Sequence, residues 1–348
     1  MELASIVEQY YESFIQLYGD TLLVEQHRAL NAIRRCRTAD SGNFYAVCSK
    51  CDHGEWRPLS CGNRNCPKCQ NHLTSQWIDK QLEKLMPVPY FMATFTLPYE
   101  LRPLAYSHQK ILYSLMFECV AEVLKSFGLK KKHLGAEIGM TLMLHTHSRR
   151  LEYHPHIHAI VPGGGIDRRF GLWRRTKTDY LFNGFALAKA FQMSLLEKLK
   201  KVGLKIPFSL PEKWVAHCDH VGAGESALKY LARYLYRGVI SEKSIVANND
   251  GEVTFRYTES KSGETKYRSL KGEKFLKLIL KHVLPNGFRR VRDYGFLHGN
   301  AKKIRSLIQL ILHVIVSKIL PRPRPTLICP KCQTEMIIKK VRWYFEPG

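Results

Sequence analysis

The chain has 348 residues, of which 45% are hydrophobic; this allows two or three folded units and excludes a disordered chain. Its 54 Lys and Arg residues outnumber 30 Asp and Glu, giving a formal charge of +24. A polyanion is therefore the expected partner, with nucleic acid first and an anionic membrane surface second. The longest apolar stretch, 307–320, contains polar residues and is shorter than the roughly 20 residues of a membrane span, so we expect no membrane-spanning segment.

The N-terminal residues 1–5 contain neither a basic segment nor a long apolar core, so we expect no secretory signal and a cytoplasmic location. The ten cysteines would then lie in a reducing compartment. Several of them are spaced as Cys-x-x-Cys, and in such a compartment this spacing favours metal binding over disulfide bonds.

Apolar residues at helical spacing predict helices in seven segments. These are residues 1–35, 73–86, 104–127, 185–202, 227–237, 271–283 and 300–319. Alternating, β-branched segments predict strands at 90–97, 140–147 and 156–162, and a hairpin within 245–269. The strands at 140–147 and 156–162 have a short connection and should pair as a hairpin, and the mixture of helices and antiparallel strands indicates an α+β fold.

Changes in composition divide the chain into three parts. Residues 1–86 should form a helical leader and a zinc-binding domain, with the cysteine-rich knuckles at about 36–72. Residues 87–300 contain all the predicted strands and should form the main folded domain, with an insertion at about 166–215. Residues 301–348 contain a helix, a basic linker of alternating Pro and Arg, and a Cys-x-x-Cys tail.

The cysteine-rich segment buries little apolar surface by itself and needs a metal to hold it. Cys48-x-x-Cys51 and Cys66-x-x-Cys69 supply four thiolates, which predicts a closed tetrahedral site for structural zinc. Another set of four ligands, or a second metal, remains open. The additional candidate ligands in this segment are Cys36, His53, Cys61 and His72.

Four cysteines lie outside this cysteine-rich segment and need a separate explanation. Cys329 and Cys332 form half a metal site, which Cys36 and Cys61 could complete across the fold. Cys119, in a predicted helix, and Cys218 are isolated, and both are expected in the core.

A second candidate metal site lies on the predicted hairpin. His156 and His158 flank one apolar residue and therefore point the same way on a strand. His145 lies on the paired strand and is a candidate third ligand, with His147 as the alternative on the same face. Two or three protein ligands leave open positions for water and phosphate oxygens, which is typical of a catalytic metal site. A purely structural pair of histidines is the competing interpretation.

Two tyrosines four residues apart, Tyr230 and Tyr234, share one face of the predicted helix 227–237. A tyrosine oxygen can attack a phosphorus that a metal polarises. A parallel stripe of cations suits a helix lying on a phosphate backbone. This stripe consists of Lys229, Arg233 and Arg237. Core tyrosines and a solvated charged face are the alternative interpretation.

Residues 168–182 are also basic and aromatic. Arg174 and Arg175 are candidate DNA-binding residues, and Phe170, Trp173 and Tyr180 could stack on bases. An ordinary basic loop would have the same composition.

Taken together, these motifs resemble the rolling-circle insertion-sequence transposases of family ninety-one, within the class of HUH single-strand endonucleases. The matching blocks, in order, are Cys36-Arg37-Thr38, residues 48–51 and 61–70, Thr96-Leu97-Pro98, Leu144-His145-Thr146, His154-Pro155-His156-Ile157-His158, residues 162–165 with a glycine turn, residues 230–235 and residues 294–297.

The resemblance implies an antiparallel-sheet HUH endonuclease domain flanked by helices and preceded by a small zinc-binding domain. It implies that Tyr230 and Tyr234 are nucleophiles and that His156 and His158 hold Mg²⁺ or Mn²⁺. The third ligand stays open between His145 and His147, since relatives are expected to carry an aromatic residue at position 147.

The same resemblance implies a nucleoid-associated bacterial enzyme that transposes through single-stranded DNA, cleaving and joining it at transposon ends and target through a 5′-phosphotyrosine. A plasmid replication initiator or conjugative relaxase would use the same chemistry in another role. A zinc-containing DNA- or RNA-binding regulator without enzymatic activity would explain the charge and the cysteines but not the histidines and tyrosines.

Overall fold

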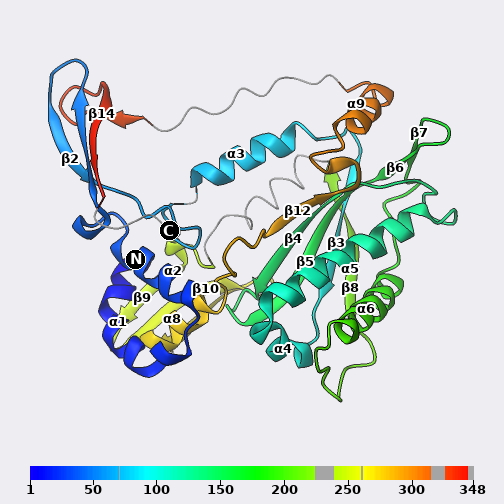
Figure 1. Cartoon of the computed structure of the whole chain (residues 1–348), viewed down its shortest axis with the longest axis horizontal. Helices are drawn as coiled ribbons and strands as arrows, with labels where there is room; N and C mark the ends of the chain where they lie inside the picture. Colours follow the sequence, from blue (N-terminus) through cyan, green and yellow to red (C-terminus); the bar gives the residue numbers. More distant parts are fainter. Residues whose placement is uncertain (70, 224–238, 260–261, 315–325, 344–348) are drawn as a thin grey trace.

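The computed structural model describes residues 1–69, 71–223, 239–259, 262–314 and 326–343. Its centre is a five-stranded antiparallel sheet in the order β12-β4-β5-β3-β8 (Figure 1). The strands are β3 (Pro89–Thr96), β4 (Met140–His147), β5 (Tyr153–Pro162), β8 (Val215–Ala223) and β12 (Val291–Tyr294). The predicted strand at 90–97 and the hairpin of 140–147 with 156–162 are confirmed, whereas β8 and β12 were not expected.

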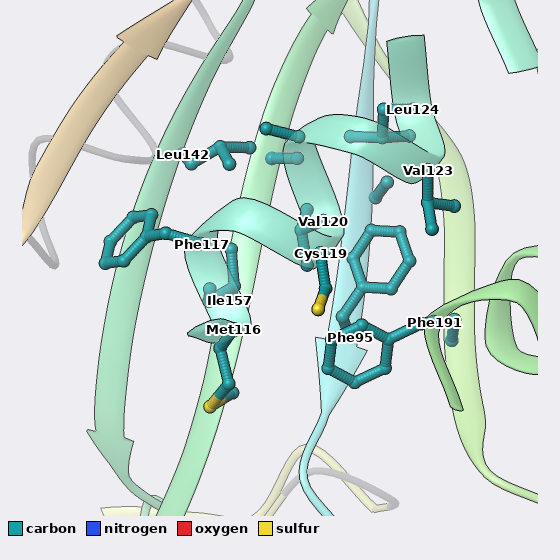
Figure 2. Packing of buried hydrophobic residues seen from close by; sticks show 14 of the residues in the cluster. Phe95, Met116, Phe117, Cys119, Val120, Val123, Leu124, Leu142, Ile157 and Phe191 are labelled. Atoms are coloured by element: carbon teal, nitrogen blue, oxygen red, sulfur yellow. The ribbon is translucent and has the colours of Figure 1, made fainter. Parts of the chain in front are cut away.

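One face of this sheet is covered by helices α5 (Gln109–Leu129) and α6 (Gly184–Lys201). Every second residue of the central strands points into this layer, including Phe95, Leu142 and Ile157 (Figure 2). Cys119 of α5 is fully buried there, as expected. The layer forms the largest apolar core and leaves the alternate residues of the strands on the opposite face.

The described helices α3 (Asn71–Leu82) and α9 (Lys302–Ile311) pack on one end of the opposite face. Met143 and Ile160 pack there with Trp77 of α3 and Ile308 of α9. Polar residues occupy the rest of this face along β4 and β5, including the histidines. The face therefore has an apolar end and a polar end.

The glycines at 163–165 allow close packing rather than a simple turn. Gly164 begins β6 (Gly164–Asp167), which pairs with β7 (Leu172–Arg175). A Cβ on Gly164 would lie 2.6 Å from the Trp173 ring, and one on Gly165 would lie 2.6 Å from the Glu137 carbonyl oxygen. Since side chains do not fit at these distances, the chain needs glycine where the β6–β7 hairpin meets the main sheet.

A second core joins the beginning of the chain to residues 240–283. The predicted helix 1–35 is divided into α1 (Leu3–Tyr18) and α2 (Val24–Arg35) by a short 3₁₀ turn at Gly19–Thr21. Both helices pack with α8 and a three-stranded antiparallel sheet. The strands of this sheet are β9 (Ile245–Asn249), β10 (Glu252–Thr258) and β11 (Thr265–Lys271), and helix α8 spans Gly272–Leu280.

Another sheet is built from strands of the N-terminal and C-terminal parts of the chain. Its order is β13-β14-β1-β2, and it extends away from the other two cores (Figure 1). The strands are β1 (Asn43–Cys48), β2 (Gly54–Pro58), β13 (Leu327–Ile328) and β14 (Glu335–Arg342). Strand β14 pairs with β1 along its length, so the C-terminal tail is part of the same unit as the first Cys-x-x-Cys motif.

The remaining helices differ in extent from those predicted. The segment 104–127 contains the end of α4 (Arg102–Ser107) and most of α5, separated at His108. A helix was expected over 300–319. Helix α9 ends earlier, at Ile311, and His313 just after it has a left-handed φ of 52°. The predicted helix 227–237 lies outside the described residues. Within the described parts of the chain, every helix is too short or too polar to cross a membrane.

Phe14 tests whether the N-terminal helices share a core with α8. The ring is fully buried in this second core, so Phe14→Ala should lower the free energy of unfolding by about 3–5 kcal/mol. Gln16→Ala, on the exposed side of the same helix, should have little effect. Urea unfolding followed by circular dichroism measures both, and equal midpoints for the two variants would contradict the packing described here.

Candidate active site and cysteine clusters

Three histidines converge at the polar end of the central sheet. His145 on β4 pairs directly with His156 on β5, so their side chains share a face, and His158 follows two residues later. One ring nitrogen from each lies within 4.8 Å of the others. The ring centroids of His145 and His158 are 4.6 Å apart. The sequence named these three histidines as candidate ligands, with His147 as the alternative to His145.

Hydrogen bonds orient two of these rings. Thr94 on β3 has its Oγ1 2.9 Å from Nδ1 of His158. Nδ1 of His156 lies 2.7 Å from the carbonyl oxygen of His154, to which it can donate. Both contacts engage Nδ1 and leave Nε2 available for a metal, as neighbouring groups do for metal-binding histidines.

Burial keeps the three imidazoles neutral. It lowers the pKa of His158 to about 3, helped by the nearby His156. Burial also lowers the pKa of His145 well below its usual value, with His158 and His156 adding to the effect. Burial also lowers the pKa of His156. Neutral imidazole is the form that ligates a metal, so this group can hold a divalent ion with positions left for other ligands.

His147 is not part of the three-histidine group. The β4–β5 register shifts between His145 and His147, which interrupts the regular alternation of side chains. The His147 ring lies 5.2 Å from the ring of His282, whose Nε2 is 2.9 Å from the Leu151 carbonyl oxygen. The geometry therefore brings His145 to the pair and places His147 beside a different histidine.

Two residues near the group were not singled out from the sequence. Thr94 could have been found from its alternation with Thr96, which places both on the face that carries the histidines. Arg102, from α4, donates through Nη2 to Nδ1 of His154 at 2.6 Å. No local pattern indicates Arg102, because the contact depends on how α4 approaches β5.

The remaining sequence candidates for catalysis and DNA binding fall in two places. The tyrosines and the cationic stripe lie outside the described residues; these are Tyr230, Tyr234, Lys229, Arg233 and Arg237. Arg174 and Arg175 lie at the end of β7. Nε of Arg174 donates to Oδ2 of Asp167 at 2.8 Å, and this arginine holds the pKa of the carboxyl group below its usual value. Arg175 is exposed.

The cysteines form two clusters of four. In the first cluster, Cys36 lies at the end of α2 and the others lie in the loop before α3. Its members are Cys36, Cys61, Cys66 and Cys69. The sulfur of Cys36 is 3.5 Å from that of Cys69 and 3.6 Å from that of Cys66. Four thiolates around one zinc ion have sulfurs about 3.8 Å apart, so this cluster fits tetrahedral zinc.

The second cluster combines the first knuckle with the C-terminal tail. Its members are Cys48, Cys51, Cys329 and Cys332. This grouping differs from the expected set, in which Cys48 and Cys51 would join Cys66 and Cys69. The β1–β14 pairing brings the tail to the first knuckle, whereas α2 brings Cys36 to the second knuckle. The spacing of the cysteines along the chain does not reveal either of these tertiary contacts.

Arg64 connects the first cysteine cluster with the central sheet. It lies in the loop between Cys61 and Cys66, and its guanidinium donates to the carbonyl oxygens of Leu284, Pro285 and Phe288, each at 2.8 Å. Phe288 packs against α5 in the core of the central sheet. A planar, five-donor group suits this position because it satisfies three backbone acceptors at once.

Comparisons with known proteins agree with this arrangement. Residues 6–97 match the family model described as a transposase zinc-binding domain, and residues 139–305 match one described as a putative transposase. The putative transposase y4qJ of Sinorhizobium fredii is 34% identical over 331 residues, which cover 88% of this chain and 83% of that protein. The chain belongs to the IS91 family of transposases.

A second member, the transposase for insertion sequence element IS801 of Pseudomonas savastanoi pv. phaseolicola, is 27% identical over 75% of this chain and 68% of its own length. In this IS91-family chain, the zinc-binding domain contains the first cysteine cluster together with Cys48 and Cys51. The transposase model contains the three histidines. Cys329 and Cys332 lie outside both matched regions.

Solved structures of the conjugative relaxase TrwC in complex with oriT DNA also match this transposase. The similarity covers 64% of this chain and 74% of the relaxase, at 15% identity and a TM-score of 0.29. A metal-free structure of the same relaxase with oriT DNA gives a TM-score of 0.30.

Arg64→Lys tests the connection between the zinc-binding domain and the central sheet. An ammonium group keeps the charge but cannot bridge three carbonyl oxygens, so the free energy of unfolding should fall by about 2 kcal/mol. Arg35→Lys, an exposed position near the same cysteine cluster, is the matched control. If urea unfolding gave the same midpoint for both variants, the three hydrogen bonds of Arg64 would not contribute to stability.

Proposed function

We propose that this transposase cleaves single-stranded DNA at transposon ends and transfers it to a target strand through a 5′-phosphotyrosine intermediate. The observation that supports this most strongly is the group of His145, His156 and His158 at the polar end of the sheet. Three neutral imidazoles, two of them oriented through Nδ1, are suited to hold a metal ion with positions open to phosphate. Such an enzyme would act in the cytoplasm, associated with the nucleoid.

The proposed catalytic ion is Mg²⁺ or Mn²⁺, held by these three histidines. When bound, it would polarise a non-bridging oxygen of the scissile phosphate. An all-nitrogen donor set is poor for Mg²⁺, which prefers oxygen ligands. We therefore expect Mn²⁺ to support higher activity than Mg²⁺ at equal concentration.

Tyr230 and Tyr234 are the proposed nucleophiles. The described residues nearest to this segment are Ala223, which pairs with Pro89 at the end of β3 away from the histidines, and Val239, which packs against the core that contains Leu151. Leu151 lies two residues before the start of β5, the strand that carries His156 and His158.

In the proposed step, a tyrosine oxygen forms a bond to phosphorus while the bond from phosphorus to the 3′-oxygen breaks. The phenol loses its proton and the departing 3′-oxygen gains one. The phosphotyrosine keeps the energy of the phosphodiester, so a 3′-hydroxyl of another strand can reverse the reaction without an external energy source. The second tyrosine would cut or accept that other strand.

Cationic side chains would hold the DNA backbone. Arg175 is exposed at the end of β7, and Arg102 lies beside His154, next to the proposed metal ligands. Arg174 is paired with Asp167 and would contribute less charge to DNA. Lys229, Arg233 and Arg237 remain proposed phosphate contacts. Binding through such contacts should weaken steeply with salt.

The competing functions explain fewer of the features observed in this chain. A replication initiator or relaxase would share the proposed chemistry, but the chain belongs to a transposase family. A regulator without enzymatic activity would not need three neutral histidines grouped on one face of a sheet.

The covalent intermediate can be tested with labelled single-stranded DNA from the end of the element. The protein with Mn²⁺ or Mg²⁺ should produce a labelled band of protein size on denaturing electrophoresis. The double variant Tyr230→Phe with Tyr234→Phe should lose this band and retain DNA binding, since only the two hydroxyl groups are removed.

Tyr236→Phe, in the same segment, is the control and should leave the adduct unchanged. Salt-sensitive binding without any adduct, on DNA that contains the true end, would refute the covalent mechanism and favour a binding protein.

Thr94→Val tests the orientation of His158. Valine keeps the shape but removes the hydroxyl contact to Nδ1, which should weaken metal binding about 10–100-fold with the fold preserved. Thr96→Val is the matched control, on the same face of the same strand. Titration of Mn²⁺ by calorimetry measures both affinities, and equal affinities would show that the Thr94 contact does not support a metal ligand.

A further inference from the structure

The sheet that joins the two ends of the chain has very little core of its own. Among the described residues, its buried cluster contains Ala46, Cys48, Cys329 and Met336, and three partly buried hydrophobic residues pack against it. The outer residues of β14 are exposed, Ile337 and Ile338 each by about half. Burial of so few side chains does not offset the conformational entropy lost in ordering four strands. Another interaction must hold this sheet together.

The four cysteines of this sheet are placed to supply the interaction that holds it together. Cys48 and Cys51 form a knuckle at the end of β1, and Cys329 and Cys332 form a second knuckle directly after β13. The sulfurs of Cys48 and Cys332 are 3.3 Å apart, and those of Cys51 and Cys329 are 3.7 Å apart. A disulfide would need about 2.05 Å, whereas sulfurs around one zinc ion lie about 3.8 Å apart.

The backbone supports the same arrangement at both knuckles. The amide of Cys48 donates to the carbonyl oxygen of His53 at 2.8 Å, and the amide of Cys329 donates to that of Thr334 at 2.8 Å. Each pair of cysteines therefore lies at the tip of a closed turn. Two such turns facing one another are the ligand arrangement of a zinc ribbon.

We propose that Cys48, Cys51, Cys329 and Cys332 form a second structural zinc site, separate from the site of Cys36, Cys61, Cys66 and Cys69. The chain then binds two zinc ions, and the second ion attaches the C-terminal tail to the N-terminal zinc-binding domain. Four protein thiolates close the coordination sphere, so this ion has a structural role. The proposal does not depend on the cleavage mechanism.

The site has a consequence for the exposed surface of the sheet. Strand β14 presents Lys339, Lys340 and Arg342, and the guanidinium of Arg342 lies 4.6 Å from the centre of the Trp56 ring on β2. This basic and aromatic surface exists only while β14 pairs with β1. Zinc in the second site therefore maintains it.

Metal analysis of the full-length protein, purified without chelator, tests the proposal. Inductively coupled plasma mass spectrometry should find about two zinc ions per chain. The double variant Cys329→Ser with Cys332→Ser should retain about one, because the first cluster lies in a different core. Lys331→Ser, exposed between the same two cysteines, should retain two.

Hydrogen exchange of the same proteins gives a readout independent of metal content. In the double cysteine variant, amides of β14 and β1 should exchange at least tenfold faster, whereas those of α1 and α8 should be unchanged. One zinc ion in the wild-type chain, unchanged zinc content in the double variant, or iron in place of zinc would each overturn the proposal. Unchanged exchange in β14 would overturn the role of the ion in attaching the tail.

Discussion

The antiparallel register between β4 and β5 is the constraint on which the candidate active site depends. It sets His145 opposite His156 and places Leu144 opposite Ile157 on the other face. Because side chains alternate along each strand, one register serves both the apolar core under α5 and the histidine group. A slip of one residue would put the imidazoles into the apolar core and the leucine and isoleucine onto the polar face. Apolar burial on one face thus enforces the arrangement of the other.

The parts of the molecule outside the central sheet are held by different interactions. The N-terminal helices bury a conventional apolar core against α8, and the first cysteine cluster lies at its edge. Arg64 extends from that cluster to the segment 284–288, which packs under the central sheet. The zinc-binding domain is therefore connected by hydrogen bonds to the same core that supports the histidines. The outer sheet has too small a core for this and carries four cysteines instead.

The central hairpin and the histidine group could be predicted because their information is local. Alternation over 140–147 and 156–162 indicates the strands, and His-x-His on one of them indicates a shared face. Pairing the two strands gave His145 and His147 as alternatives for the third ligand. The choice of His145 over His147 required the irregular register between them, which no pattern in the sequence reveals. Arg102 and Arg64 were missed because each acts on an element distant in sequence.

The sequence by itself determined the family, the α+β class, the period-two pattern that puts His156 beside His158, and the supply of cysteines for metal. These follow from composition and from spacing over a few residues, where chain geometry is nearly independent of the rest of the fold. Only the tertiary structure decided which cysteines meet. Cys48 and Cys51 join a tail almost three hundred residues away, and Cys66 and Cys69 join the end of α2. Identical Cys-x-x-Cys motifs are interchangeable locally, so their partners are set by strand pairing and helix packing.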